Sequence, residues 1–129
     1  MRNLLALAMA GLMTAAAPAA DEPAKDKPAT IEQVEKQLEK GAQLLDVRTK
    51  SEWDKGHLKG ATRVDIFKDG FLEKVKAKMD PKKPLVVYCH SGGRSADATE
   101  QLREAGFTTV YDLDGGITAW KKAGKPVEK

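Results

Sequence analysis

Apolar residues along this chain follow two patterns, short unbroken runs and runs repeated every three or four positions. Unbroken runs are typical of strands buried on both faces, and the repeats are typical of helices with one apolar face. The expected strands are residues 44–47, 61–66, 85–88 and 108–113, and the expected helices begin near residues 31, 51, 71, 95 and 117.

Strands and helices alternate along the chain, and no Asn-Gly turn of the hairpin type joins two strands. This order predicts an α/β fold with a mainly parallel central sheet and helices on both faces. In such sheets the reactive groups lie beyond the carboxyl ends of the strands. The loops after Val47, Tyr88 and Leu113 are therefore expected to converge.

The first residues have the composition of a secretory signal peptide, which we place at residues 1–19. Arg2 is followed by an apolar core, and the small residues Ala17 and Ala19 form a cleavage motif. A retained membrane anchor is the alternative, but an alanine-rich run that contains Pro18 spans a bilayer poorly. We therefore expect a periplasmic or secreted protein with no stable membrane insertion after cleavage.

The rest of the chain is read as one domain. Residues 20–29 are charged and contain prolines, which indicates a flexible linker. Residues 30–124 form the expected domain, and residues 125–129 form a tail that is expected to fray.

Charge and cysteine content narrow the function classes. The formal net charge is +3, and the loss of Arg2 with the signal peptide leaves +2, which does not favour a nucleic-acid partner. The single cysteine excludes an intramolecular disulfide, and together with two histidines it disfavours a structural zinc site. No cofactor and no metal are expected.

Cys89 directly follows the most apolar strand and precedes a loop of sequence His-Ser-Gly-Gly-Arg-Ser, after which a helical pattern begins. The sulfur is thus expected at a helix N-terminus, where the amides of residues 91–95 favour a thiolate or a bound anion. The glycines let amides turn inward, and Arg94 adds a positive charge. A buried structural cysteine is the alternative, but apolar residues usually flank such a cysteine on both sides.

Three segments carry a recognisable set of residues. They are LDVR at 45–48 with Glu52-Trp53 and GHLKGA at 56–61, the Cys89 loop, and VYDLDGGITAW at 110–120. In order and spacing they resemble the rhodanese-like family over about residues 30–123, although Lys59 stands where that family usually has proline. The resemblance implies a persulfide mechanism. Cys89 would take sulfur from a donor such as thiosulfate and pass it to cyanide or to a thiol, which can be small or carried by a protein.

These arguments assign the candidate site residues. Cys89 and Arg94 are expected to be catalytic, and the expected substrate-binding residues are Arg48, His90, Ser91, Gly92, Gly93 and Ser95. For Arg48, an ion pair that braces the loops is the favoured alternative. His90 is equally suited to a place on the rim of the site, and Ser95 to a helix N-cap. His57 is expected to bond loop backbone rather than to take part in catalysis.

Two other functions are compatible with this fold class. A cysteine-dependent phosphatase needs C-x5-R, but the spacing from Cys89 to Arg94 is C-x4-R and Ser95 occupies the phosphatase arginine position. The shorter loop suits a single sulfur atom better than a tetrahedral phosphate. A rhodanese-like binding or sulfur-carrier module without enzyme activity is the other alternative, although such domains commonly lose the cysteine that this chain keeps.

Overall fold

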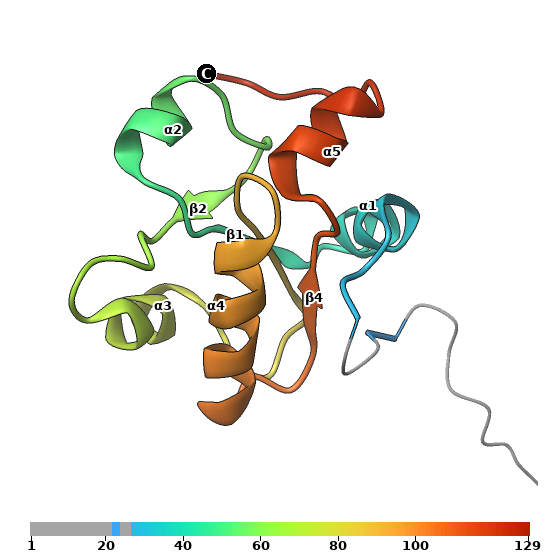
Figure 1. Cartoon of the computed structure of the whole chain (residues 1–129). Helices are drawn as coiled ribbons and strands as arrows, with labels where there is room; N and C mark the ends of the chain where they lie inside the picture. Colours follow the sequence, from blue (N-terminus) through green and yellow to red (C-terminus); the bar gives the residue numbers. More distant parts are fainter. Residues whose placement is uncertain (1–21, 24–26) are drawn as a thin grey trace, which may run out of the picture.

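The centre of the fold is a parallel sheet, which Figure 1 shows in the computed structural model of residues 22–23 and 27–129. Its strands are β1 (Gln43–Asp46), β2 (Thr62–Arg63), β3 (Leu85–Tyr88) and β4 (Val110–Asp112), and they lie in the order β2-β1-β3-β4. Every neighbouring pair is parallel, which confirms the predicted α/β architecture. The expected signal peptide, residues 1–19, lies outside the described residues.

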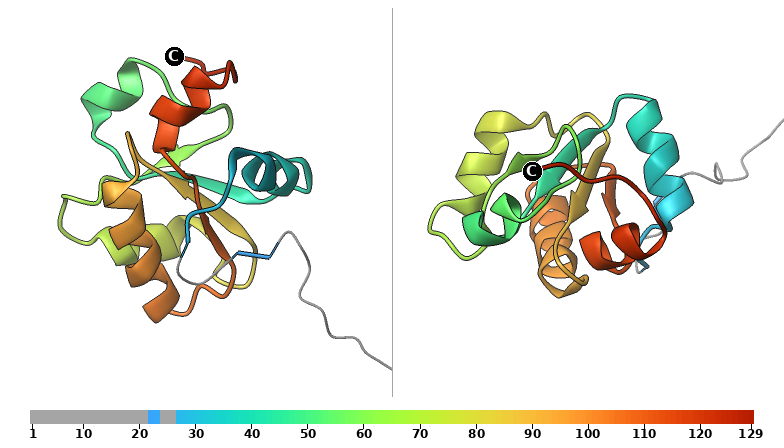
Figure 2. Two further views of the ribbon diagram at one scale, coloured as in Figure 1. Left: turned by 45° about the vertical axis from the view of Figure 1, so that its right-hand side comes forward. Right: turned by 90° about the horizontal axis from the view of Figure 1, so that it is seen from above.

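Helices cover both faces of the sheet. They are α1 (Ile31–Glu39), α2 (Lys50–Asp54), α3 (Phe71–Lys78), α4 (Gly93–Glu104) and α5 (Gly116–Lys122). Figure 2 shows α3 and α4 on one face and α1 and α5 on the other, while α2 lies at the end where the strands finish. In the part of the chain that the structure describes, no helix is long and apolar enough to cross a bilayer.

Strand β3 lies between β1 and β4 and is covered on both faces, which explains why its residues are all apolar. Successive side chains on a strand point to opposite faces. Leu85 and Val87 accordingly belong to the core under α3 and α4, whereas Val86 and Tyr88 belong to the core under α1 and α5. Because both faces are covered, β3 delivers the next residue, Cys89, into the interior at the carboxyl end of the sheet.

Strand β2 is shorter than the expected strand 61–66. The chain still bonds to β1 beyond Arg63, because Val64 N–H donates to the Asp46 carbonyl over 2.9 Å. The Asp65 carboxylate then accepts the Phe67 N–H over 2.9 Å, which turns the backbone out of the sheet. The Ile66 N–H also donates to the Val47 carbonyl over 3.1 Å, so backbone bonding to the β1 segment continues to the end of the expected strand, and the chain turns away only at Phe67.

Residues from the expected linker and the expected tail contact the domain. Ala29, at the end of the expected linker, is buried and forms a parallel bridge with Leu113. The expected tail is bonded to the loop after α2 and to α5. His57 and Glu128 exchange two backbone hydrogen bonds of 2.8 Å, and Trp120 Nε1–H donates to the Pro126 carbonyl over 2.9 Å.

Candidate active site

The sulfur of Cys89 lies between the end of β3 and the start of α4. The residue is 1% exposed, and its Sγ accepts the Gly92 N–H over 3.0 Å. Gly92 has φ of +122°, a conformation that other residues adopt only under strain, and α4 begins at the following residue. The expected position of the thiol at a helix N-terminus is thus present, with Gly92 as the amide that donates to Sγ.

Helix α5 packs against the Cys89 loop on the side of its backbone carbonyls. The Ile117 and Thr118 N–H groups donate to the carbonyls of Cys89 and His90 over 2.9 and 3.0 Å. In a trans peptide the N–H points away from the carbonyl, so the amides that follow these two carbonyls point away from α5. Gly116 makes this approach feasible, because a Cβ there would lie 2.5 Å from the Cys89 carbonyl oxygen. Sequence reasoning missed this role, for which the pair Gly115-Gly116 was the available signal.

Ser95 lies on the inner side of the sulfur, in the first turn of α4 rather than at the N-cap, which is Gly92. Its Oγ is 3.4 Å from Cys89 Sγ and donates to Asp112 Oδ1 over 2.6 Å. Burial raises the pKa of the Asp112 carboxyl, against the opposing effects of the Ser95 hydrogen bond and the charge of Arg103. Asp112 was not among the expected site residues, and its signal is a carboxylate at the end of a buried strand.

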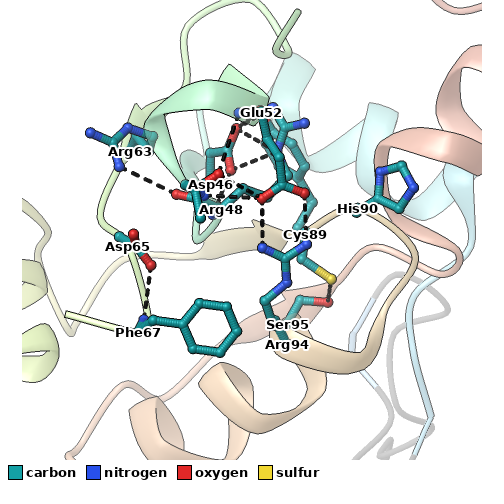
Figure 3. Close-up of polar contacts among 12 residues, drawn as sticks. Asp46, Arg48, Glu52, Arg63, Asp65, Phe67, Cys89, His90, Arg94 and Ser95 are labelled. Atoms are coloured by element: carbon teal, nitrogen blue, oxygen red, sulfur yellow. Dashed lines mark hydrogen bonds and ion pairs between the residues drawn. The ribbon is translucent and has the colours of Figure 1, made fainter. Parts of the chain in front are cut away.

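Arg94 extends from α4 toward α2, where it forms a two-pronged ion pair with Glu52 over 2.7 and 2.8 Å (Figure 3). This hydrogen bonding is the largest cause of the lowered pKa of Glu52, which is about 2. Glu52 also accepts the Thr49 N–H as part of the capping box of α2. The Arg94 guanidinium lies 5.6 Å from the centre of the Phe67 ring, which is 70% exposed. Arg94 is therefore a fixed charge beside the loop.

Arg48, expected among the substrate-binding residues, is buried in an ion pair with Asp46 instead of being exposed to a substrate. It is 3% exposed, and its Nη2 binds Asp46 Oδ2 over 2.7 Å and the Gly56 carbonyl over 2.8 Å. The Tyr88 hydroxyl donates to the same carboxylate over 2.7 Å, and burial raises the pKa of Tyr88. The alternative, an ion pair that braces the loops, describes the observed geometry.

Three further loop residues lie on the outside of the site. Ser91 and Gly93 are exposed, and the exposed His90 ring points away from Sγ, with its Nε2 3.5 Å from Thr118 Oγ1 (Figure 3). They can meet a substrate at the rim. His57 takes the structural place expected for it, since its Nδ1 lies 3.1 Å from the Trp53 carbonyl and its ring stacks on Trp53.

Fold and loop together define a class of protein, in which the central strand of a parallel sheet ends in a cysteine held at the start of the next helix. A model of the rhodanese-like domain matches residues 30–123, and the chain belongs to this family.

Named relatives and a solved structure extend this finding. The chain is 41% identical over 97 residues to thiosulfate sulfurtransferase 16 (chloroplastic) of Arabidopsis thaliana, a match that covers 68% of this chain and 81% of the relative. It is 37% identical over 84 residues to thiosulfate sulfurtransferase GlpE of Shewanella oneidensis, covering 65% and 80% of the two chains. The solution structure of the 30 kDa polysulfide-sulfur transferase homodimer of Wolinella succinogenes matches with a TM-score of 0.65 and 33% identity, covering 84% of this chain and 80% of that one.

Proposed function

We propose that this protein is a sulfurtransferase that moves sulfane sulfur from a donor such as thiosulfate to cyanide or a thiol through a persulfide on Cys89. The observation that carries the proposal is the Gly92 N–H that donates to Sγ at the N-terminus of α4. The relatives that are named thiosulfate sulfurtransferases support the same chemistry.

The reaction divides into two displacements at sulfur. The Cys89 thiolate attacks the outer sulfur of thiosulfate, a new S–S bond forms, and sulfite leaves with the electron pair of the old S–S bond. The acceptor, for example cyanide, then attacks the outer sulfur of the persulfide. Thiocyanate forms, and Cys89 leaves as a thiolate with the electrons of the S–S bond.

The loop suits the intermediate on grounds of size and charge. The outer sulfur of a persulfide lies about 2 Å beyond Sγ. Amides at the start of α4 stabilise such a soft anion without rearrangement, which is electrostatic preorganisation. The Arg94 guanidinium has five N–H donors, and its pairing with Glu52 occupies two of them. The others remain for an anionic donor such as thiosulfate.

The proposal is tested by changing Cys89 to Ser, a replacement of similar shape that provides a poor and harder nucleophile. The variant should fold, as measured by circular dichroism, but should form no thiocyanate from thiosulfate and cyanide. In parallel, intact mass spectrometry of wild-type protein after thiosulfate treatment should show a reducible gain of about 32 Da, the mass of one sulfur atom.

Two results would contradict the proposal. One is near-wild-type turnover in a folded Cys89→Ser variant. The other is a wild-type protein that gains no sulfur from any small donor but binds a protein partner, which would favour the alternative of a binding module.

We further propose that the protein acts outside the cytoplasm, in the periplasm or as a secreted protein, after removal of residues 1–19. The composition of that segment supports this location.

A further inference from the structure

A chain of polar contacts leads from the sulfur into the protein, away from the loop rim. Ser95 is fully buried, and its Oγ lies 3.4 Å from Cys89 Sγ, 2.6 Å from Asp112 Oδ1 and 3.2 Å from the Gly92 carbonyl oxygen. A hydroxyl has one proton to donate, and the shortest of these contacts is the one to the carboxylate. Ser95 therefore donates to Asp112, and the Cys89 thiol donates its own proton to Ser95 Oγ.

This arrangement changes once the sulfur becomes an anion. A thiolate has no proton to donate, so the Ser95 hydroxyl turns to donate to Sγ. Oγ then presents a lone pair to Asp112 Oδ1, and two unprotonated oxygens at 2.6 Å repel each other. The contact remains favourable if Asp112 carries a proton. Ionisation of Cys89 and protonation of Asp112 are thereby linked through one hydroxyl.

We propose that Asp112 is the proton acceptor for Cys89, with Ser95 as the group that passes the proton on. In this step the S–H bond breaks and its proton goes to Ser95 Oγ, while Ser95 gives its own proton to Asp112 Oδ1. The negative charge moves from the carboxylate to the sulfur, and nothing is oxidised or reduced. The purpose of the step rests on the proposed function, because the resulting thiolate is what attacks the sulfur donor.

The surroundings of Asp112 favour this role. The side chain is 8% exposed, and burial raises the pKa of its carboxyl, as does the nearby charge of Asp114, while Ser95 and Arg103 lower it. A cavity of about 910 Å³ between α4 and the loop after β4 is lined by Asp112, Gly92, Thr99, Glu100, Arg103 and Asp114. This cavity gives the carboxyl group a route for proton exchange with solvent.

The charged groups near the Cys89 sulfur are not the ones that surround Asp112. Arg94 faces Cys89 from α4, and its charge is balanced by Glu52 on α2. A thiolate formed by the transfer is therefore close to a fixed guanidinium, whereas the proton has moved to the opposite side of Ser95. Separating the proton from the sulfur in this way leaves the outer side of the loop free for the donor.

The pH dependence of Cys89 alkylation by iodoacetamide tests the link without any sulfur transfer. Two groups that share one proton titrate in two steps, so the wild-type rate should rise through two steps with a plateau between them. Asp112→Asn should show a single step, with a rate that changes about tenfold per pH unit below it, as for one ionisation. The matched control is Asp114→Asn, which removes a neighbouring carboxylate that Ser95 does not contact and should keep both steps.

Variants at Ser95 complete the test. Ser95→Ala should give the single step of Asp112→Asn, and Ser95→Thr, which keeps the hydroxyl, should restore two. The double variant Ser95→Ala/Asp112→Asn should behave like either single variant, because both break one path. A single step with the same midpoint in the wild type and in Asp112→Asn would overturn the proposal.

A second readout follows the proton itself. Difference infrared spectroscopy on addition of thiosulfate should show a carboxylate signal replaced by a protonated-carboxyl signal in the wild type and in Asp114→Asn, but not in Asp112→Asn. A persulfide that forms with no such signal would refute the proton transfer and leave the sulfurtransferase intact. If no persulfide forms while the alkylation shows two steps, the proposed function fails and the proton link stands.

Discussion

Arg94 and Glu52 show how one pair of residues fixes the electrostatics of the site. The guanidinium donates two hydrogen bonds to the Glu52 carboxylate and lies over the ring of Phe67, so it is preorganised rather than mobile. Glu52 in turn is held by the capping box of α2. A residue of α2, early in the chain, thereby positions a charge on α4.

Replacing Arg94 by Ala should reduce thiosulfate turnover by about tenfold to a thousandfold, the range for losing one preorganised donor or charge. Arg94→Lys should restore turnover in part, because it keeps the charge but loses the planar fork. Steady-state kinetics provide the measurement, and Lys50→Ala, which removes an exposed cation from α2, is the control. Unchanged kinetics in Arg94→Ala would remove this residue from the site.

The ion pair of Arg94 with Glu52 should also be visible in how the free energy of unfolding depends on pH. The pKa of Glu52 is about 2 in the folded protein and 4.5 as the reference value. Because the folded pKa is the lower one, the stabilisation is complete above pH 4.5 and is lost as the pH falls toward 2. Urea unfolding across this window should therefore show a smaller loss of stability in Glu52→Gln than in the wild type. Arg94→Ala should show a smaller reduction of the same sign, because the hydrogen bonds from Thr49 still lower the pKa of Glu52. An unchanged pH dependence in both variants would contradict the assignment.

Residues close together in sequence were predictable at this scale, and distant partners were not. One short segment contains Cys89, Gly92, Arg94 and Ser95, and the order of these residues was enough to predict an anion-binding loop. The pairing of β4 with β3 brings Asp112 next to Ser95. The register of two paired strands cannot be predicted from the residues of either strand alone, so this contact was missed.

Among the elements of the sheet, β1 and β3 lie where their apolar patterns predict them, whereas β2 and β4 are shorter than the expected strands. β3 was predictable with its bounds because burial on both faces demands an unbroken apolar run. β2 covers only Thr62–Arg63, although backbone hydrogen bonds to the β1 segment continue to Ile66. The start of α5 was predicted from the sequence, but the contact of α5 with the Cys89 loop was not predicted. When two backbone segments pack closely, a glycine is the only sign of it in the sequence.

That approach makes Gly116 sensitive to a single methyl group. In Gly116→Ala the added Cβ would lie 2.5 Å from the Cys89 carbonyl oxygen and 2.6 Å from that of His90, which forces the loop to move. We expect lower stability and a loss of thiosulfate turnover beyond what unfolding explains, measured by urea unfolding and by kinetics on the folded fraction.

Gly124→Ala is the control for this prediction. Gly124 also has positive φ, +79° against +61° at Gly116, but a Cβ there meets nothing within 4 Å. It should show the backbone penalty of about 1–2 kcal/mol with turnover unchanged. Equal effects of the two substitutions on turnover would mean that α5 does not set the loop geometry.

At the scale of the whole molecule, segments on both sides of the expected domain are bonded to it through the backbone. Ala29 extends the sheet beside Leu113, and Glu128 pairs with His57 in the loop after α2. Neither contact was predictable from the sequence, since both segments are polar and contain proline, a composition usual in linkers. Short segments of this kind become ordered when the folded domain offers them backbone partners.

Processing at the N-terminus is the last prediction, and it concerns the location of the whole protein. Cleavage after Ala19 would give a mature chain that begins at Ala20 and reaches the sheet at Ala29. N-terminal sequencing and intact mass of protein from the exported fraction should find Ala20 as the first residue. Ala19→Leu should block cleavage, because the motif needs a small residue there, whereas Ala24→Leu, outside the motif, should be processed normally. Retention of Met1 in the wild type, in a membrane or cytoplasmic fraction, would refute export through this segment while leaving the chemistry at Cys89 untouched.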